Sequence, residues 1–158
     1  MSVLIIIIVT LLMEPLTAIT HRIIMHKHIW IWHKSHHERY AGKFELNDLF
    51  PIVFSLIAIG LFLAGTKYDY FTPVAIGITI YGATYFVVHE IIIHSRFMRI
   101  KSNNPLFNYW RFSHNVHHQF HKEPYGFIVP VTPKDLKEKA KNNPRDLIDR
   151  FNSKTTAG

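Results

Sequence analysis

The chain has 158 residues, 48% of them hydrophobic, with a formal net charge of +7 and no cysteine. The lack of cysteine excludes disulfides and thiolate metal sites, so any metal must be held by histidine, aspartate or glutamate. A basic chain can bind nucleic acid or an anionic membrane surface. Here the hydrophobic residues fall in three long blocks that are nearly free of charge, which favours a membrane and excludes nucleic acid as the partner.

The first block, residues 2–20, is about long enough to cross a bilayer as a helix. A secretory signal peptide would need a preceding Lys or Arg and a following small-x-small cleavage site, and the sequence has neither. Glu14, followed by Pro15, interrupts the block. An ionisable residue at that depth is either functional or a protonated side chain facing a neighbouring helix, and both interpretations stay open.

The second and third blocks, residues 49–65 and 71–88, are separated only by residues 66–70. This spacing predicts a helical hairpin, with Pro51 and Pro73 near the helix starts, where proline is tolerated. Each block is short for a full span. Either the bilayer thins locally, or the helices extend into the flanking residues.

The charges predict the orientation of these helices. If the first block crosses once and the hairpin twice, residues 21–48 and 89–158 lie on the same side. These segments carry five and twelve Lys or Arg residues, whereas the hairpin tip has only Lys67. The positive-inside rule therefore places both segments in the cytoplasm. All twelve histidines lie in these two segments, which predicts one shared site at the cytoplasmic face.

The remainder of the chain is predicted to lie outside the bilayer. Residues 104–118 are typical of an aromatic-rich helix near the interface, and the prolines of residues 124–133 favour an extended segment. Residues 134–158 are predicted to be a charged soluble tail. The fold class is therefore an all-α membrane protein with three to four transmembrane helices, in a single integral-membrane domain over residues 1–158. Its membrane part is predicted at residues 1–20 and 49–88.

Ten of the twelve histidines fall in four compact clusters. Two have the spacing H-x4-H and two have H-x2-H-H. In chain order they are His21 and His26; His33, His36 and His37; His89 and His94; and His114, His117 and His118. Positions i, i+3 and i+4 of an α-helix project from one face, so an H-x2-H-H stripe can converge on one metal or divide between two. Ten imidazoles are too many for one ion, and the clusters predict two metals, of which zinc, iron, copper and nickel all suit imidazole.

The H-x4-H clusters fit an α-helix less well. Five residues turn an ideal α-helix about 140° past a full circle. His21 and His26 would therefore not share a face of a straight α-helix, and neither would His89 and His94. Either the helix bends, or the two rings of each pair reach different ions.

His28 and His121 fall outside the clusters and are expected to be solvated or to support ligand rings. Five nearby carboxylates are expected to cap helices or orient the rings rather than bind metal. They are Glu38, Glu45, Asp48, Glu90 and Glu123. The sequence has no Ser-His-Asp order, phosphate-binding glycine loop or dinucleotide motif.

The alternation of these clusters with membrane helices resembles the fatty acid hydroxylase superfamily of membrane diiron oxygenases. Three further stretches resemble its β-carotene hydroxylase subgroup, and the short chain resembles the bacterial members. They are WHKSHHE (32–38), GKFELNDLF (42–50) and PYGFIVPVTPKDL (124–136). The resemblance covers roughly residues 14–136. One departure is Glu90, because the subgroup usually has aspartate there, a side chain shorter by one methylene.

The resemblance implies an O2-dependent β-carotene 3-hydroxylase that converts β-carotene to β-cryptoxanthin and then zeaxanthin. It implies a helical protein integral to a bacterial inner membrane, with a site facing the cytoplasm and a carotenoid substrate dissolved in lipid. It also implies two iron ions, which zinc can replace in overexpressed protein. Electrons would come from an external donor such as ferredoxin and its reductase, since no flavin, haem or iron–sulfur motif is present. The ligands carried over from the family are His21, His26, His33, His36, His37, His89, His94, His114, His117 and His118.

Two other functions stay open at this point. One is the same diiron chemistry on a fatty acid, a sterol or another lipid, against which the FELND and PYGF stretches argue. The other is a non-enzymatic membrane protein that transports metal or holds structural zinc. Transport would need polar ligands through the depth of the bilayer, where only Glu14 lies.

Overall fold

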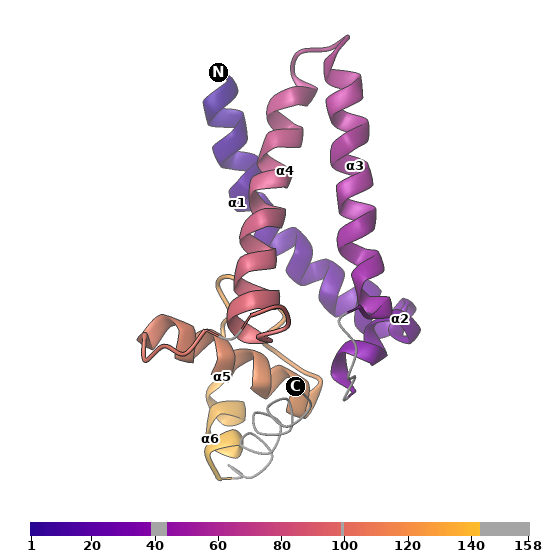
Figure 1. Cartoon of the computed structure of the whole chain (residues 1–158). Coiled ribbons are helices and arrows are strands. Elements are labelled where there is room, and N and C mark those ends of the chain that lie inside the picture. The colour runs from indigo at the N-terminus through magenta and orange to yellow at the C-terminus, as the bar shows by residue number, and fades with distance from the viewer. Residues whose placement is uncertain (39–43, 99, 143–158) are drawn as a thin grey trace.

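A computed structural model describes residues 1–38, 44–98 and 100–142, and within these ranges every regular element is a helix. The predicted all-α class is confirmed. Residues 42–43 of the GKFELNDLF stretch and residues 143–158 of the predicted tail lie outside the described residues. Figure 1 shows three long helices side by side, with shorter helices gathered at one end.

The first membrane helix begins as α1 (Ser2–Thr20) and continues directly into a π-helix, η1 (His21–His28). Many of its apolar side chains are exposed, which suits a surface in contact with lipid. Pro15 inside α1 has no N–H to give to the preceding turn, and this accounts for the bend of the helix in Figure 1.

The predicted hairpin is formed by α3 (Leu49–Gly65) and α4 (Phe71–Tyr85). A single 3-10 turn, η2 (Leu46–Asp48), precedes α3, and α4 continues into a second π-helix, η3 (Phe86–Ile93). α4 packs against both α1 and α3 and lies between them in Figure 1. The three long helices therefore form one bundle, with α4 as its central member.

Three helices are long and apolar enough to cross a membrane, and they are Ser2–His28, Leu46–Gly65 and Phe71–Ile93. The sequence predicted three to four such helices, and the described residues contain three. The short apolar blocks extend into flanking residues, and the π-helices supply that extension in the first and third spans. The chain is an integral membrane protein.

The polar end of the molecule lies at the end of the bundle away from the hairpin tip (Figure 1). Its helices are α2 (Trp30–His37), α5 (Pro105–Phe120) and α6 (Lys134–Asn142). α5 corresponds to the helix predicted within residues 104–118, and α6 forms the start of the predicted charged tail. The segment at 124–133 contains no regular element, as its prolines predicted.

Two local features hold α5 in place. At its start, the side chain of Asn104 accepts a hydrogen bond from the N–H of Leu106, which satisfies one of the unpaired donors of the first turn. On the face towards α6, Val116 packs with Leu136 and Ala140 in a small buried core. α5 is thus fixed at one end by a cap and along one face by apolar packing.

Candidate metal centre

The ten clustered histidines gather at the polar end in two neighbouring groups. Within each group, the candidate ligand atoms all lie within 4.8 Å of one another. The first histidine group is His21, His26, His33, His37 and His117; the second is His36, His94, His114 and His118. His89 lies beside the second group, with its ring centroid 4.6 Å from those of both His94 and His114. Every predicted ligand is therefore brought to this centre.

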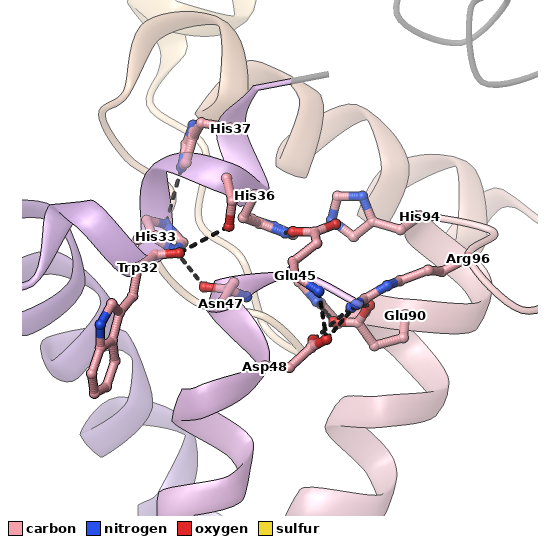
Figure 2. Close-up of polar contacts among 12 residues, drawn as sticks. Trp32, His33, His36, His37, Glu45, Asn47, Asp48, Glu90, His94 and Arg96 are labelled. Atoms are coloured by element: carbon pink, nitrogen blue, oxygen red, sulfur yellow. Dashed lines mark hydrogen bonds and ion pairs between the residues drawn. The ribbon is translucent and has the colours of Figure 1, made fainter. Parts of the chain in front are cut away.

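The H-x2-H-H stripe on α2 divides between the two groups. His33 and His37 belong to the first group and His36 to the second. Figure 2 shows His36 directed towards His94, whereas a dashed line joins His33 to His37. Successive residues of an α-helix are about 100° apart, so His36 and His37 face different directions. Of the two arrangements predicted for this stripe, the described structure has the divided one.

The stripe on α5 divides in the opposite sense. His114 and His118, four residues apart, join the second group, and His117 joins the first. Each helix therefore gives a pair at i and i+4 to one group and the histidine between them to the other. This reciprocal arrangement explains why two copies of the same motif build two adjacent groups.

The H-x4-H pairs are arranged by π-helices rather than α-helices. His21 and His26 lie in η1, whereas His89 lies in η3 and His94 directly follows it. In a π-helix the backbone bond runs from residue i+5 to residue i, so residues five apart lie about one turn from each other. The N–H of His94 donates to the carbonyl of His89 in this way, at 3.0 Å. The ring centroids of His21 and His26 lie 5.0 Å apart, and those of His89 and His94 lie 4.6 Å apart. The expectation for a straight α-helix does not apply here, because the backbone is π-helical. The two rings of each pair lie together and not at different groups.

Nδ1 of five rings is directed at an oxygen acceptor of another described residue. The pairs are His21 with the Tyr125 carbonyl (2.9 Å), His33 with Asn47 Oδ1 (2.7 Å), His36 with Glu45 Oε2 (3.3 Å), His89 with Glu90 Oε1 (2.8 Å) and His117 with the Lys122 carbonyl (2.6 Å). Four of these contacts are hydrogen bonds, whereas the His36–Glu45 contact is an ion-pair distance. A carbonyl or carboxylate oxygen can only accept, so Nδ1 of the four hydrogen-bonded rings must carry the hydrogen. In a neutral ring, Nε2 then carries a free lone pair, which is the form that binds a metal.

Two of these rings, His21 and His33, point their Nε2 atoms at each other. His21 Nε2 lies 3.0 Å from His33 Nε2, although both rings carry their hydrogen on Nδ1. Two lone pairs at this distance repel, and a cation between them would remove the repulsion. Nitrogen ligands about 2.1 Å from one ion and at right angles to each other would lie about 3.0 Å apart. The first histidine group therefore fits a metal ion.

The second histidine group fits a metal ion for a related reason. Nε2 of His94 and Nε2 of His114 lie 2.8 Å apart. The buried Nε2 atoms of His36, His89 and His118 have no hydrogen-bond partner among the described residues. Buried polar atoms without a partner are rare and costly, and a metal ion would satisfy all three.

Burial keeps the rings outside the membrane spans neutral. The pKa values of His33 and His117 are both lowered to about 3, mainly by loss of water and also by neighbouring imidazoles, while the hydrogen bonds to Asn47 and to the Lys122 carbonyl oppose the shift. The same desolvation holds the pKa values of His36, His114 and His118 well below the usual 6.5. Neutral imidazole is the ligand form, so these side chains are available to a metal at neutral pH.

The FELND stretch orients the rings of α2. Figure 2 shows Asn47 and Glu45 facing the α2 histidines, where they contact His33 and His36. Asp48 caps the same turn by accepting from the N–H of Glu45 at 2.8 Å. Neither Glu45 nor Asp48 belongs to a candidate metal-binding group among the described residues.

A second set of charged residues supports His89. Glu90 accepts from His89 Nδ1 and, through its other oxygen, from Arg96 at 2.8 Å. Arg96 also donates through both terminal nitrogens to Asp48 (Figure 2). Glu90 therefore makes the orienting contact despite its extra methylene, and Arg96 links the end of η3 to the start of α3.

Sequence reasoning missed four of these partners, one of which is the Lys122 carbonyl beside His117. Asn47 lies within the FELND stretch, which was singled out for the resemblance but not for a contact. Nothing in the local sequence distinguishes Arg96 or the carbonyl of Tyr125, because each meets its partner only through the tertiary fold.

The sequence did not decide the roles of Glu14, His28 and His121, and the structure now describes their surroundings. Glu14 accepts hydrogen bonds from Tyr81 on α4 and from the backbone of residues 127–129. The ring of His121 lies 4.6 Å from that of His37, and His28 is exposed. Neither of these histidines is in a metal-binding group among the described residues.

A basic cleft of about 370 Å³ opens beside the first histidine group. It is lined by Arg22, His26, Lys27, Trp30, His121 and Tyr125. The Trp30 ring lies 5.4 Å from that of His26 and 5.3 Å from that of His37. One wall of the cleft, at Trp30, is therefore in contact with rings of the first histidine group.

No family model and no solved structure matches the chain. Curated proteins do match it over most of its length. It is 39% identical to the β-carotene hydroxylase of Pseudescherichia vulneris, over 84% of this chain and 79% of that protein. It is 36% identical to the β-carotene hydroxylase of Paracoccus sp. (strain PC1), over 92% and 98% respectively. The chloroplastic β-carotene 3-hydroxylase of Gentiana lutea is 34% identical over 75% of this chain and 39% of its own length.

Proposed function

The chain belongs to the β-carotene hydroxylase family, and we propose that it hydroxylates β-carotene at carbon 3 of each β-ionone ring. The first product would be β-cryptoxanthin and the second zeaxanthin. Each step inserts one atom of O2 into a C–H bond and, with two electrons and two protons, releases the other as water. The names of the relatives favour this substrate over a fatty acid or a sterol.

The observation that carries the proposal is the facing pair of Nε2 lone pairs on His21 and His33, 3.0 Å apart. We assign one metal to each histidine group, with His89 completing the second. Two iron ions there would supply the O2 activation that hydroxylation of an unactivated C–H bond requires. The protein keeps the imidazoles neutral, orients them through Nδ1 and excludes water by burial.

The membrane helices support a substrate that arrives through lipid. The centre lies where the first and third candidate spans end, since His21, His26 and His89 belong to those helices. A carotenoid lying in the bilayer can therefore reach the centre without entering water. We place the centre at the cytoplasmic face of a bacterial inner membrane, because 17 of the 18 Lys and Arg residues lie on its side of the predicted topology.

The electrons must come from an external carrier. The basic cleft at Arg22 and Lys27 suits an acidic donor such as ferredoxin. Trp30 lines that cleft and contacts the rings of His26 and His37 in the first histidine group.

Pigment analysis tests the function directly. Expression in cells that accumulate β-carotene should yield β-cryptoxanthin and zeaxanthin by chromatography. His36→Ala and His117→Ala remove one ligand from each group and should abolish both products at normal protein levels. His28→Ala is the matched control, because His28 is exposed and lies outside both groups. No hydroxylated pigment from the unmodified protein, or full activity in either ligand variant, would overturn the proposal.

A further inference from the structure

Glu14 is a carboxylate inside the first candidate membrane span, and both of its oxygens accept hydrogen bonds. Oε1 accepts from three consecutive backbone N–H groups, those of Phe127 (2.9 Å), Ile128 (3.0 Å) and Val129 (3.0 Å). Oε2 accepts from the hydroxyl of Tyr81 at 2.7 Å. One side chain on α1 thus holds a segment more than a hundred residues further along the chain.

The held segment contacts one imidazole in two ways. The carbonyl of Tyr125 accepts from Nδ1 of His21 at 2.9 Å. The ring of Phe127 stacks on that of His21, with centroids 4.9 Å apart and planes inclined by 13°. His21 is almost wholly buried, so these two contacts determine the direction of its Nε2.

Gly126 makes the close approach possible. A Cβ added at this position would lie 2.9 Å from Glu14 Oε1 and 3.2 Å from the carbonyl oxygen of Val129. A side chain there would push the segment away from the carboxylate. Glu14 therefore supplies the acceptor for the N–H groups of residues 127–129, and Gly126 leaves the space that this contact needs.

Phe127 also meets the rings of His89 and Tyr85 edge-on, at 5.1 and 4.9 Å. His89 depends less on this segment than His21 does, because its Nδ1 is held separately by Glu90. Loss of the segment should consequently disturb the first histidine group and spare the second.

We propose that Glu14 is a positioning residue for the first metal site. By binding the N–H groups of residues 127–129, it holds the Tyr125 carbonyl and the Phe127 ring against His21, and so directs Nε2 of His21 at the metal. The inference rests on the proposed function only in taking the first histidine group as a metal site.

Cobalt(II) titration of the chelator-treated protein in detergent tests this role, because the visible absorption of bound cobalt reports each site. His37→Ala and His118→Ala identify the bands of the first and second sites. Glu14→Leu should weaken binding at the first site by about tenfold or more and leave the second unchanged. Gly126→Ala should show the same selective loss.

Two matched variants separate positioning from general stability. Tyr81→Phe removes the link from Glu14 to α4 but leaves the held segment, and both sites should keep their affinity. Glu14→Gln retains an oxygen for the three N–H groups and should lie within about threefold of the unmodified protein. These two variants and Gly126→Ala decide the question even if Glu14→Leu does not fold.

Equal weakening at both sites, no weakening in Glu14→Leu or Gly126→Ala, or a comparable loss in Tyr81→Phe would overturn the positioning role. Failure of the unmodified protein to bind cobalt would overturn the proposed metal centre itself. Cobalt binding without hydroxylated pigment would overturn the enzymatic function and leave the positioning role standing.

Discussion

At the residue scale, the centre depends on which nitrogen of each ring carries the hydrogen. An oxygen acceptor at Nδ1 fixes that choice for His21, His33 and His117. The acceptors have different origins, two being backbone carbonyls and one a side-chain amide. A backbone carbonyl is available from any residue type, so only the fold determines which carbonyl meets which ring. Supporting contacts of this kind set ligand orientation and basicity in metal sites.

Asn47 gives the most direct test of such a contact. Asn47→Ala leaves Nδ1 of His33 without its acceptor and frees the ring to turn or change tautomer. Metal affinity at the first site should fall by roughly 10–100-fold, measured by cobalt titration. Ser35→Ala is the control, because the Ser35 hydroxyl only bonds to its own helix at the Trp32 carbonyl. An affinity in Asn47→Ala equal to that of the control would contradict the assignment.

At the element scale, the two π-helices have the same role. η1 and η3 each continue a membrane helix. η1 contains His21 and His26, whereas η3 contains His89 and ends one residue before His94. Bonding between residues five apart places both rings of a pair on one side. The end of each membrane helix is thereby a ligand-bearing element, which α-helical geometry would not permit at this spacing.

Packing between the membrane helices can be tested with a pair of glycines on α4. A Cβ at Gly77 would lie 2.8 Å from the Cβ of Val9 on α1, whereas nothing lies within 4 Å of one at Gly82. Gly77→Ala should lower the free energy of unfolding by about 1–3 kcal/mol through overpacking. Gly82→Ala should be neutral or slightly stabilising, because alanine favours a helix. Thermal midpoints in one detergent would measure both, and equal midpoints would contradict close α1–α4 packing.

At the scale of the whole molecule, the protein joins a lipid-facing bundle to a buried cluster of neutral imidazoles. The bundle exposes apolar side chains along three helices, which is stable only in lipid or detergent. The cluster crowds nitrogen lone pairs together, and a metal cation between them would remove their repulsion. The histidine cluster lies where the membrane helices end, so the candidate metal centre is beside the lipid in which the substrate dissolves.

This arrangement predicts how the metal-free protein responds to acid. The pKa values of His33 and His117 are about 3 when folded and about 6.5 when unfolded. Between these values the unfolded chain binds more protons, so stability is fully present above pH 6.5 and falls as the pH decreases towards 3. Chelator-treated protein should therefore melt at progressively lower temperature from pH 8 to pH 5. His28→Ala should melt with the same dependence, and a midpoint that rises in acid would contradict neutral buried rings.

The sequence alone was sufficient for the helices and for the list of candidate ligands. Long apolar blocks require membrane spans, and repeated histidine spacings can be counted without knowing the fold. The hairpin from the second and third blocks and the helix within residues 104–118 followed from local patterns in the same way.

Only the tertiary structure decided how those ligands divide and what supports them. It split each H-x2-H-H stripe between two groups, and it resolved the H-x4-H pairs through π-helices. It also brought Glu14 to residues 127–129 and Asn47 to His33. Local periodicity describes directions around one helix axis, whereas these contacts depend on how separate axes and loops pack. The sequence by itself therefore determined which side chains the protein has for a metal centre, and packing determined which nitrogen atoms face one another within it.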